Sequence, residues 1–145
     1  MNGKHRVTDL SFPAELRFEN CAIRLAEQTA REMGFSVSRI ADIRTAVSEA
    51  VINAIEHSGT DQSGLKVHLI LRAEWGHCLR MEVRDQGPGF DPQKIQIPQI
   101  EEKLKPERSK RGWGLFLIRS LADEVEVSSV EGQGNSLRLT FRLSS

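Results

Sequence analysis

The segment SEAVINAIEHS, residues 48–58, places three polar side chains four residues apart: Glu49, Asn53 and His57. At about 100° per residue of helix, the three fall within roughly 80° of one another, one above the next on a single stripe. A carboxylate, a carboxamide and an imidazole can exchange protons or hydrogen bonds, and a helix does not need them for packing. The spacing therefore indicates a polar functional edge on an otherwise amphipathic helix.

A second candidate is the segment DQGPGF, residues 85–90, which follows a strand-like run. Two glycines flank a proline, so the chain must turn tightly and can bring its backbone close to a ligand. Asp85, at the end of the strand, can accept a hydrogen bond from an amino group such as that of adenine. A plain turn explains the same residues equally well.

A third candidate is RGWGLFLI, residues 111–118, where glycines open a predicted helix. The free N–H groups of a helix N-terminus form an anion site when no side chains cover them. Each exposed contact of this kind contributes only ~0.3–1 kcal/mol, so several of them plus Arg111 would be needed to hold a triphosphate. Tight helix packing is the alternative explanation of the glycines.

The segment between these two glycine-rich corners is longer than the ~12–15 residues usual for an unstructured connection. A long basic segment in this place can act as a lid that closes over phosphates. A solvated charged loop is the alternative, which three glutamates in the segment support. The segment carries Lys103, Lys105, Arg108 and Lys110, followed by Arg111.

The composition indicates one globular domain. The chain has 145 residues, of which 39% are hydrophobic and 28% charged, and its 20 Lys and Arg balance its 20 Asp and Glu. A net charge of zero gives no general attraction to nucleic acid or to anionic membranes. No apolar run approaches the ~20 residues of a membrane span, and the polar N-terminus lacks a secretory signal. Two cysteines do not make a disulfide framework, so we expect a cytoplasmic protein.

Apolar residues at helical spacing predict two consecutive helices. The first covers residues 14–33 and ends at Gly34, a typical C′ residue. Ser36 or Ser38 can cap the second helix, which carries the polar stripe and runs to residue 58.

Alternating apolar residues predict strands on either side of these helices. A strand precedes Pro13, and a hairpin is expected from residues 65–74 and 78–85. A third helix over residues 112–123 is followed by a second hairpin around GQGN. The order favours an α+β fold, a two-layer sandwich with helices on one face of a mixed, mostly antiparallel sheet.

Taken in order, ExxxNAxxH, DxGxGF, the lid and GxGLFLI resemble the histidine kinase-like (Bergerat) ATP-binding fold of type II topoisomerases, heat-shock chaperones and histidine kinases. Within that superfamily the chain most resembles the anti-sigma factor serine kinases of bacterial partner-switching systems. The MGF join between the first two helices and the AVSEAxxNAxxH box are the most specific features. The resemblance covers nearly the whole chain and implies a single domain over 1–145, with an ATP lid at about 91–111.

The resemblance implies roles for the polar stripe. Asn53 would supply an amide oxygen to Mg²⁺, which needs few protein ligands besides phosphates and waters. Glu49 would act as the general base that deprotonates a serine hydroxyl or a water. Histidine kinases usually place a histidine at this position, so glutamate favours an oxygen nucleophile. His57 would close the ATP pocket or fix the helix end, and a structural histidine is an equal alternative.

The same resemblance assigns the other ATP-binding residues. Asp85 would pair with the adenine amino group. The family often has a threonine near the adenine in its last hairpin. This chain reads GQGNS there, so either Ser136 supplies that hydroxyl or the contact is lost. The loop and phosphate-binding residues implied by the motifs are Gly87, Gly89, Phe90, Arg111, Gly112, Trp113, Gly114 and Leu115.

By resemblance, the protein is expected to be a homodimer that phosphorylates a small anti-anti-sigma (STAS-type) protein and binds a sigma factor. Phosphorylation adds ~−1.5 to −2 charge to the partner and can break the complex. The main alternative is an ATP-binding module that sequesters a regulator with little or no kinase activity. ATP-driven clamps and histidine kinases are disfavoured, because they need a transducer domain or a dimerisation helix pair that this sequence does not provide.

Overall fold

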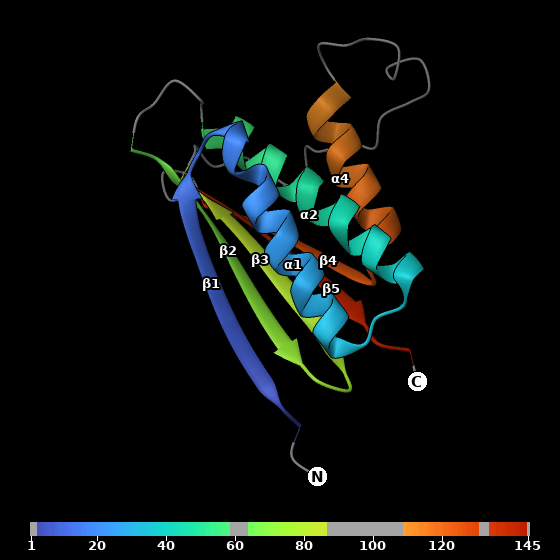
Figure 1. The fold of residues 1–145 in the computed structure, drawn as a ribbon. Helices are drawn as coiled ribbons and strands as arrows, with labels where there is room; N and C mark the ends of the chain where they lie inside the picture. The colour runs from blue at the N-terminus through green and yellow to red at the C-terminus, as the bar shows by residue number, and fades with distance from the viewer. Residues whose placement is uncertain (1–2, 59–63, 87–108, 131–133, 145) are drawn as a thin grey trace.

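A computed structural model describes residues 3–58, 64–86, 109–130 and 134–144, with the backbone alone for residues 109–113 and 130. Within these residues, five strands form one sheet in the order β1-β2-β3-β5-β4, and the helices cover one face of it (Figure 1). The elements are β1 (His5–Pro13), η1 (Leu16–Phe18), α1 (Glu19–Met33), α2 (Val37–Ser58), β2 (Lys66–Glu74), β3 (Cys78–Asp85), α4 (Ser109–Leu121), β4 (Glu124–Val130) and β5 (Gly134–Arg142).

The α+β sandwich is confirmed, but the described sheet is not mixed, since all four of its pairings are antiparallel. The reason lies partly in the helices α1 and α2, which run out and back between β1 and β2. They return the chain to the end of β1, where Pro13 pairs with Lys66 and the Ala14 N–H donates to the Leu65 carbonyl at 3.0 Å. Strand β2 therefore starts beside the end of β1 and runs antiparallel to it.

The first helix begins five residues later than the sequence predicted. Residues 16–18 form a 3-10 turn before α1 starts at Glu19, because the Ala14 N–H is bonded to the β2 side of the sheet. Its C-terminus is as predicted: Gly34 has φ 90°, and its N–H donates to the carbonyls of Ala30 and Arg31.

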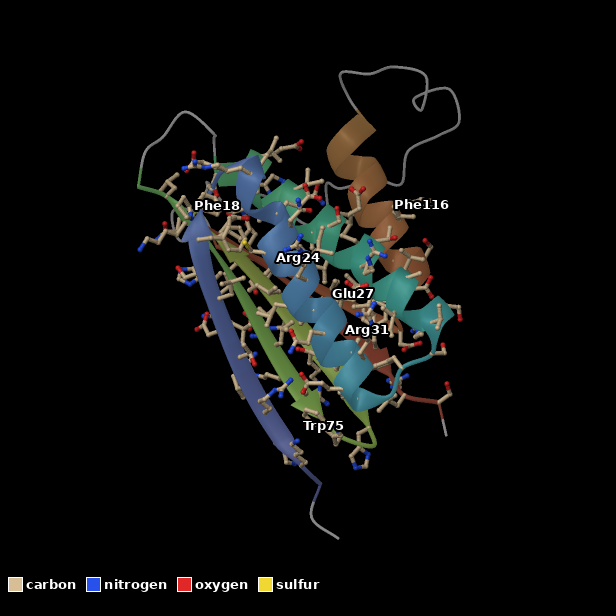
Figure 2. All side chains as sticks on the ribbon, in the orientation of Figure 1. Phe18, Arg24, Glu27, Arg31, Trp75 and Phe116 are labelled. Carbon is tan, nitrogen blue, oxygen red and sulfur yellow. The ribbon has the colours of Figure 1, made fainter. Side chains whose placement is uncertain are left out.

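Helix α2 is capped by Ser36, whose Oγ accepts the Arg39 N–H at 3.1 Å. This helix packs on both α1 and α4 and lies between them in the helical layer (Figure 1). On the outer side, Arg24, Glu27 and Arg31 follow one another along α1 (Figure 2), and Glu27 Oε1 lies 3.7 Å from Arg44 Nε of α2. The polar stripe is therefore held on the central helix of the layer.

The core lies between the helices and the inner face of the sheet. The predicted alternation of Val67, Leu69 and Leu71 is confirmed, since all three are fully buried. The turn of this hairpin contains Gly76 with φ 83°, a conformation that favours glycine. No helix in the described parts of the chain is both long and apolar enough to span a bilayer.

The C-terminal end of α4 is fixed to α2 by Arg39. Its Nη1 donates to the Leu121 carbonyl at 2.6 Å, and its Nη2 donates to Asp123 Oδ2 at 2.7 Å. The guanidinium also lies 4.7 Å from the ring centroid of Phe141 in β5. These contacts join α2, α4 and the sheet, so they help to set where α4 lies along α2.

Candidate functional site

Glu49 and Asn53 lie on the side of α2 that faces α4, where Gly114 packs against both. A Cβ atom on Gly114 would lie 2.9 Å from Asn53 Nδ2, 3.1 Å from Asn53 Oδ1 and 3.1 Å from Glu49 Oε2. The first distance is shorter than real Cβ contacts and the other two are tighter than most, so only glycine leaves the Asn53 and Glu49 side chains in these positions. The structure therefore brings together the polar stripe and one glycine of the GWGL segment.

Glu49 is partly buried at this helix contact. Burial raises the pKa of its carboxyl, and the carboxylates of Glu19 and Glu56 raise it further. Glu19 starts α1 and accepts a hydrogen bond from Ser48 Oγ at 2.5 Å, so it is held beside the catalytic candidate. A raised pKa makes the deprotonated carboxylate a stronger base.

The stripe continues one turn further to His57, whose Nδ1 lies 3.7 Å from Asp85 Oδ2. Asp85 is buried at the end of β3, with 7% of its surface exposed. Asn135 Nδ2 donates to Asp85 Oδ1 at 2.8 Å, and Ser129 Oγ donates to Asn135 Oδ1 at 2.7 Å. Four elements, α2, β3, β5 and β4, thus contribute to one polar cluster.

The two ends of the stripe differ in chemistry. Glu49 and Asn53 present carboxylate and amide oxygens, the ligands preferred by Mg²⁺, and the described residues contain no group of three His, Cys, Asp or Glu able to hold a metal. At the other end of the stripe, His57 lies next to Asp85 of β3, an acceptor suited to an amino group. Eight residues of helix separate Glu49 from His57, or about 12 Å. A ligand with a phosphate end and a base end would fit this arrangement.

Ser136 does not join this site. It pairs with Arg84 across the sheet, and its Oγ donates to Glu82 Oε2 at 2.8 Å on the face away from the helices. The residue opposite Asp85 is Asn135, because successive strand residues point to opposite faces. In this structure the residue of β5 that faces Asp85 is therefore Asn135 and not Ser136.

Helix α4 begins at Ser109, three residues before the predicted start. Gly112, Trp113 and Gly114 therefore lie within its first two turns, and Leu115 is buried with 8% exposed surface. In a helix starting at residue 109, only about the first four N–H groups lack partners within the helix. The Trp113 and Leu115 amides lie beyond these groups, and the free N–H groups of this helix are those nearer Ser109.

Several predicted residues lie outside the described part of the chain. These are Gly87, Gly89, Phe90 and residues 91–108 of the lid, while Arg111 and Trp113 are described in their backbone alone.

Three residues of the site were missed by sequence reasoning: Glu19, Ser129 and Asn135. Glu19 is brought to Glu49 by the packing of α1 on α2, which leaves no local signal. The sequence does carry a signal for Asn135, which follows Gly134 at the start of β5. The register of β5 against β3 then decides whether Asn135 or Ser136 faces the helices.

Comparison with known proteins identifies the family of this chain. Residues 12–141 match the model of the histidine kinase-like ATPase domain. An anti-sigma F factor of Thermoanaerobacter sp. (strain X514) is 33% identical over 134 residues, which cover 91% of this chain and 90% of the relative. The serine-protein kinase RsbW of Oceanobacillus iheyensis is 30% identical over 127 residues, which cover 86% of this chain and 80% of the relative.

A solved structure has the same fold. The crystal structure of the RsbU and RsbW domains of Rv1364c from Mycobacterium tuberculosis matches 97% of this chain with a TM-score of 0.64 at 24% identity. This chain corresponds to 33% of that longer chain. Sequence and fold together show that the chain belongs to the histidine kinase-like ATPase family, in its group of anti-sigma factors and serine-protein kinases.

Proposed function

We propose that the protein is an ATP-dependent protein-serine kinase and anti-sigma-type regulator that phosphorylates a small anti-anti-sigma protein in a partner-switching system. The relatives named anti-sigma F factor and serine-protein kinase support this proposal. The observation that carries it is the contact of Gly114 with Glu49 and Asn53, which joins a basic carboxylate to a hard-oxygen ligand.

Asn53 is the proposed Mg²⁺ ligand. Asn53 is buried, and both polar atoms of its amide lie near the position that a Cβ atom on Gly114 would take, as does Glu49 Oε2. One amide oxygen fits Mg²⁺, which keeps most of its waters and takes its other ligands from phosphates. When bound, the ion would neutralise phosphate charge, and Asn53 would fix its position relative to Glu49.

Glu49 is the proposed general base. It would accept the proton of the incoming serine hydroxyl. Burial, and after it the carboxylates of Glu19 and Glu56, would favour that transfer by raising the pKa of Glu49. A positioned base contributes typically ~10²–10⁴ in rate, while most of the catalysis of phosphoryl transfer comes from positioning and electrostatics.

Asp85 is the proposed acceptor for the amino group of adenine. Gly87, Gly89 and Phe90 would then line the nucleotide from the following loop, and residues 91–111 would close over the phosphates as a lid. Arg111 would add positive charge, and the free N–H groups at the start of α4, near Ser109, would add donors.

The proposed partners follow from the relatives. A sigma factor and an anti-anti-sigma protein would compete for a homodimer of this single-domain chain in the cytoplasm, with no direct contact to nucleic acid or membrane. The added phosphate would release the anti-anti-sigma protein through repulsion and desolvation.

A phosphotransfer assay tests the proposal. The protein would be incubated with γ-labelled ATP, Mg²⁺ and a cleared extract of the source cells, beside the variants Glu49→Gln and Glu126→Gln. Glu126 is an exposed residue of β4 and serves as the matched control. We expect one small labelled protein bearing phosphoserine with wild type and Glu126→Gln, and at least about 100-fold less label with Glu49→Gln. No label, with ATP binding intact, would instead support a nucleotide-gated sequestering module.

A further inference from the structure

We propose that Arg72, Arg84 and Arg138 form a binding site for a phosphate monoester on the outer face of the sheet, which is the face turned away from the helices. These three side chains, the arginine triad, come from β2, β3 and β5 and surround the carboxylate of Glu82. The inference goes beyond the proposed kinase function and does not depend on it, because the helices cover the opposite face of the sheet (Figure 1).

Glu82 holds the triad together. Arg72 Nη1 donates to Glu82 Oε1 at 3.2 Å, and Arg84 Nε donates to Glu82 Oε2 at 2.6 Å. Arg138 Nε lies 3.6 Å from the same Oε2 atom. Glu82 is buried although it lies on the outer face, so the longer side chains around it cover it. Charge-assisted hydrogen bonds fix the orientation of both partners, so the guanidiniums are held in place before a ligand binds.

The triad keeps donors that Glu82 does not use. A guanidinium carries its N–H donors in a planar fork, and Arg84 and Arg138 turn only their Nε atoms toward Glu82. Within the described residues, no hydrogen bond engages the terminal Nη groups of these two arginines. Between 46% and 58% of each side chain of the triad is exposed, so a ligand can reach these groups.

The charge on this face is unevenly distributed. Arg80 pairs with Glu74 at 2.9 Å, and Arg142 pairs with Glu124 at 2.7 Å, so each of these arginines has its own carboxylate. The triad shares the single buried carboxylate of Glu82, and three guanidiniums against one carboxylate leave two positive charges. A phosphate monoester carries ~−1.5 to −2 charge and several acceptor oxygens, so it matches both the charge and the donors of the triad. A carboxylate ligand would neutralise only half of this charge.

A hollow of about 400 Å³ beside Glu82 gives the ligand room. Arg72 and Arg138 line this hollow, as do Glu124 and Glu126 of β4. Glu126 lies 3.9 Å from Arg138 Nη1, and 76% of its side chain is exposed, so water and salt screen its charge. Because the two glutamates repel an anion, the phosphate should lie on the side of β2 and β3, within reach of the triad.

The test is an NMR titration of isotope-labelled protein with inorganic phosphate, with a phosphoserine peptide whose other residues are uncharged, and with acetate. Phosphate should shift the signals of arginine Nε–H groups and of the β3 and β5 amides in a saturable manner. Arg84→Gln and Arg138→Gln should each weaken phosphate binding at least about 3-fold, and the double variant at least about 10-fold. Arg44→Gln, altered at an exposed arginine of α2, should keep the wild-type affinity. Acetate should bind at least about 10-fold more weakly than phosphate.

The two phosphate probes distinguish the sources of the ligand. A peptide that binds at least about 10-fold more tightly than inorganic phosphate would support the site and identify a phosphorylated protein as its ligand. Equal affinities would support the site and identify a free phosphate ester.

Three results would overturn the proposal: no saturable shift at about 0.15 M salt, shifts confined to α2 and α4, or unchanged affinity in the double variant. Each of them would leave the kinase proposal standing. If the glutamine variants fail to fold by circular dichroism, Arg84→Lys and Arg138→Lys decide the matter. Lysine keeps the charge but not the planar fork, so each of these variants should still weaken phosphate binding at least about 3-fold.

Discussion

Gly114 lies against Glu49 and Asn53, and its lack of a side chain leaves room for these two polar groups. The atoms that a Cβ would meet belong to Asn53 and Glu49, not to the backbone of α2. Because these atoms end flexible side chains, the helices can keep their places while the two polar groups move. Substitution here should therefore affect chemistry more than folding.

We predict that Gly114→Ala lowers phosphotransfer at least about 10-fold, because the added methyl group displaces the proposed metal ligand and base. Its effect on the free energy of unfolding should stay within about 2 kcal/mol, since crowding is partly offset by the higher helix propensity of alanine. Urea unfolding and the phosphotransfer assay check this, with Ser120→Ala as the control in the same helix. Full activity in Gly114→Ala would contradict the close contact.

Glu82 is a buried charge on the opposite face of the sheet, with 2% of its surface exposed. Burial by itself would raise its pKa, but hydrogen bonds from Arg84, Ser136 and Arg72 outweigh this and lower the pKa to about 2 from 4.5. A lowered pKa stabilises the fold above the unfolded value of 4.5, and this contribution is lost as the pH falls toward 2.

We predict that Glu82→Gln reduces the loss of stability between pH 5 and pH 2 by roughly 3 kcal/mol relative to wild type. The variant should also be less stable at pH 7, because the arginines around it lose their buried partner. Urea unfolding at a series of pH values measures both effects. Glu126→Gln, altered at an exposed residue of the same face, should keep the wild-type profile. Parallel profiles for Glu82→Gln and wild type would rule out this contribution.

At the scale of elements, the position of α4 along α2 decides whether Gly114 reaches the polar stripe. The two helices touch near Gly114, and Arg39 ties the other end of α4 to α2 and to Asp123. Helix α4 is thus anchored where it leaves the site, whereas its N-terminal end follows the proposed lid.

We predict that Arg39→Met destabilises the fold by about 1–3 kcal/mol, because the Leu121 carbonyl and Asp123 lose a charged donor. Phosphotransfer should fall more than ATP affinity, since α4 then holds Gly114 less firmly against Asn53. Thermal unfolding, calorimetry and the phosphotransfer assay measure the three quantities. Arg44→Met removes an exposed arginine of the same helix and should cost ~0–1 kcal/mol. An Arg39→Met protein with unaltered stability and transfer would show that α4 needs no such anchor.

Across the whole molecule, the fold places the candidate site in the helical layer and the buried charge of Glu82 on the other face of the sheet. The helices α1, α2 and α4 occupy one face of the sheet (Figure 1), with Glu49, Asn53 and His57 on the central helix. The buried charge Glu82 lies on the far face, away from this layer. Stability at low pH and catalysis should therefore respond to different substitutions.

Much of this organisation followed from the sequence alone. The polar stripe of α2, the end of α1 at Gly34, the cap at Ser36 and the hairpin around Gly76 are local features, set by residues a few positions apart. Helix and strand periodicities place such residues on one face wherever the element lies. The late start of α1 and the early start of α4 were missed, because helix ends depend on hydrogen bonds made outside the helix.

The tertiary structure alone decided which distant residues meet. Nothing near Asn53 in the sequence indicates that Gly114 will touch it, nor that Glu19 will lie beside Glu49. The register of β5 against β3 put Asn135, rather than Ser136, opposite Asp85, and a shift of one residue would have turned each side chain to the other face. Local sequence patterns thus determined which side chains share one face of a helix or strand, and long-range packing determined which side chains of different elements meet.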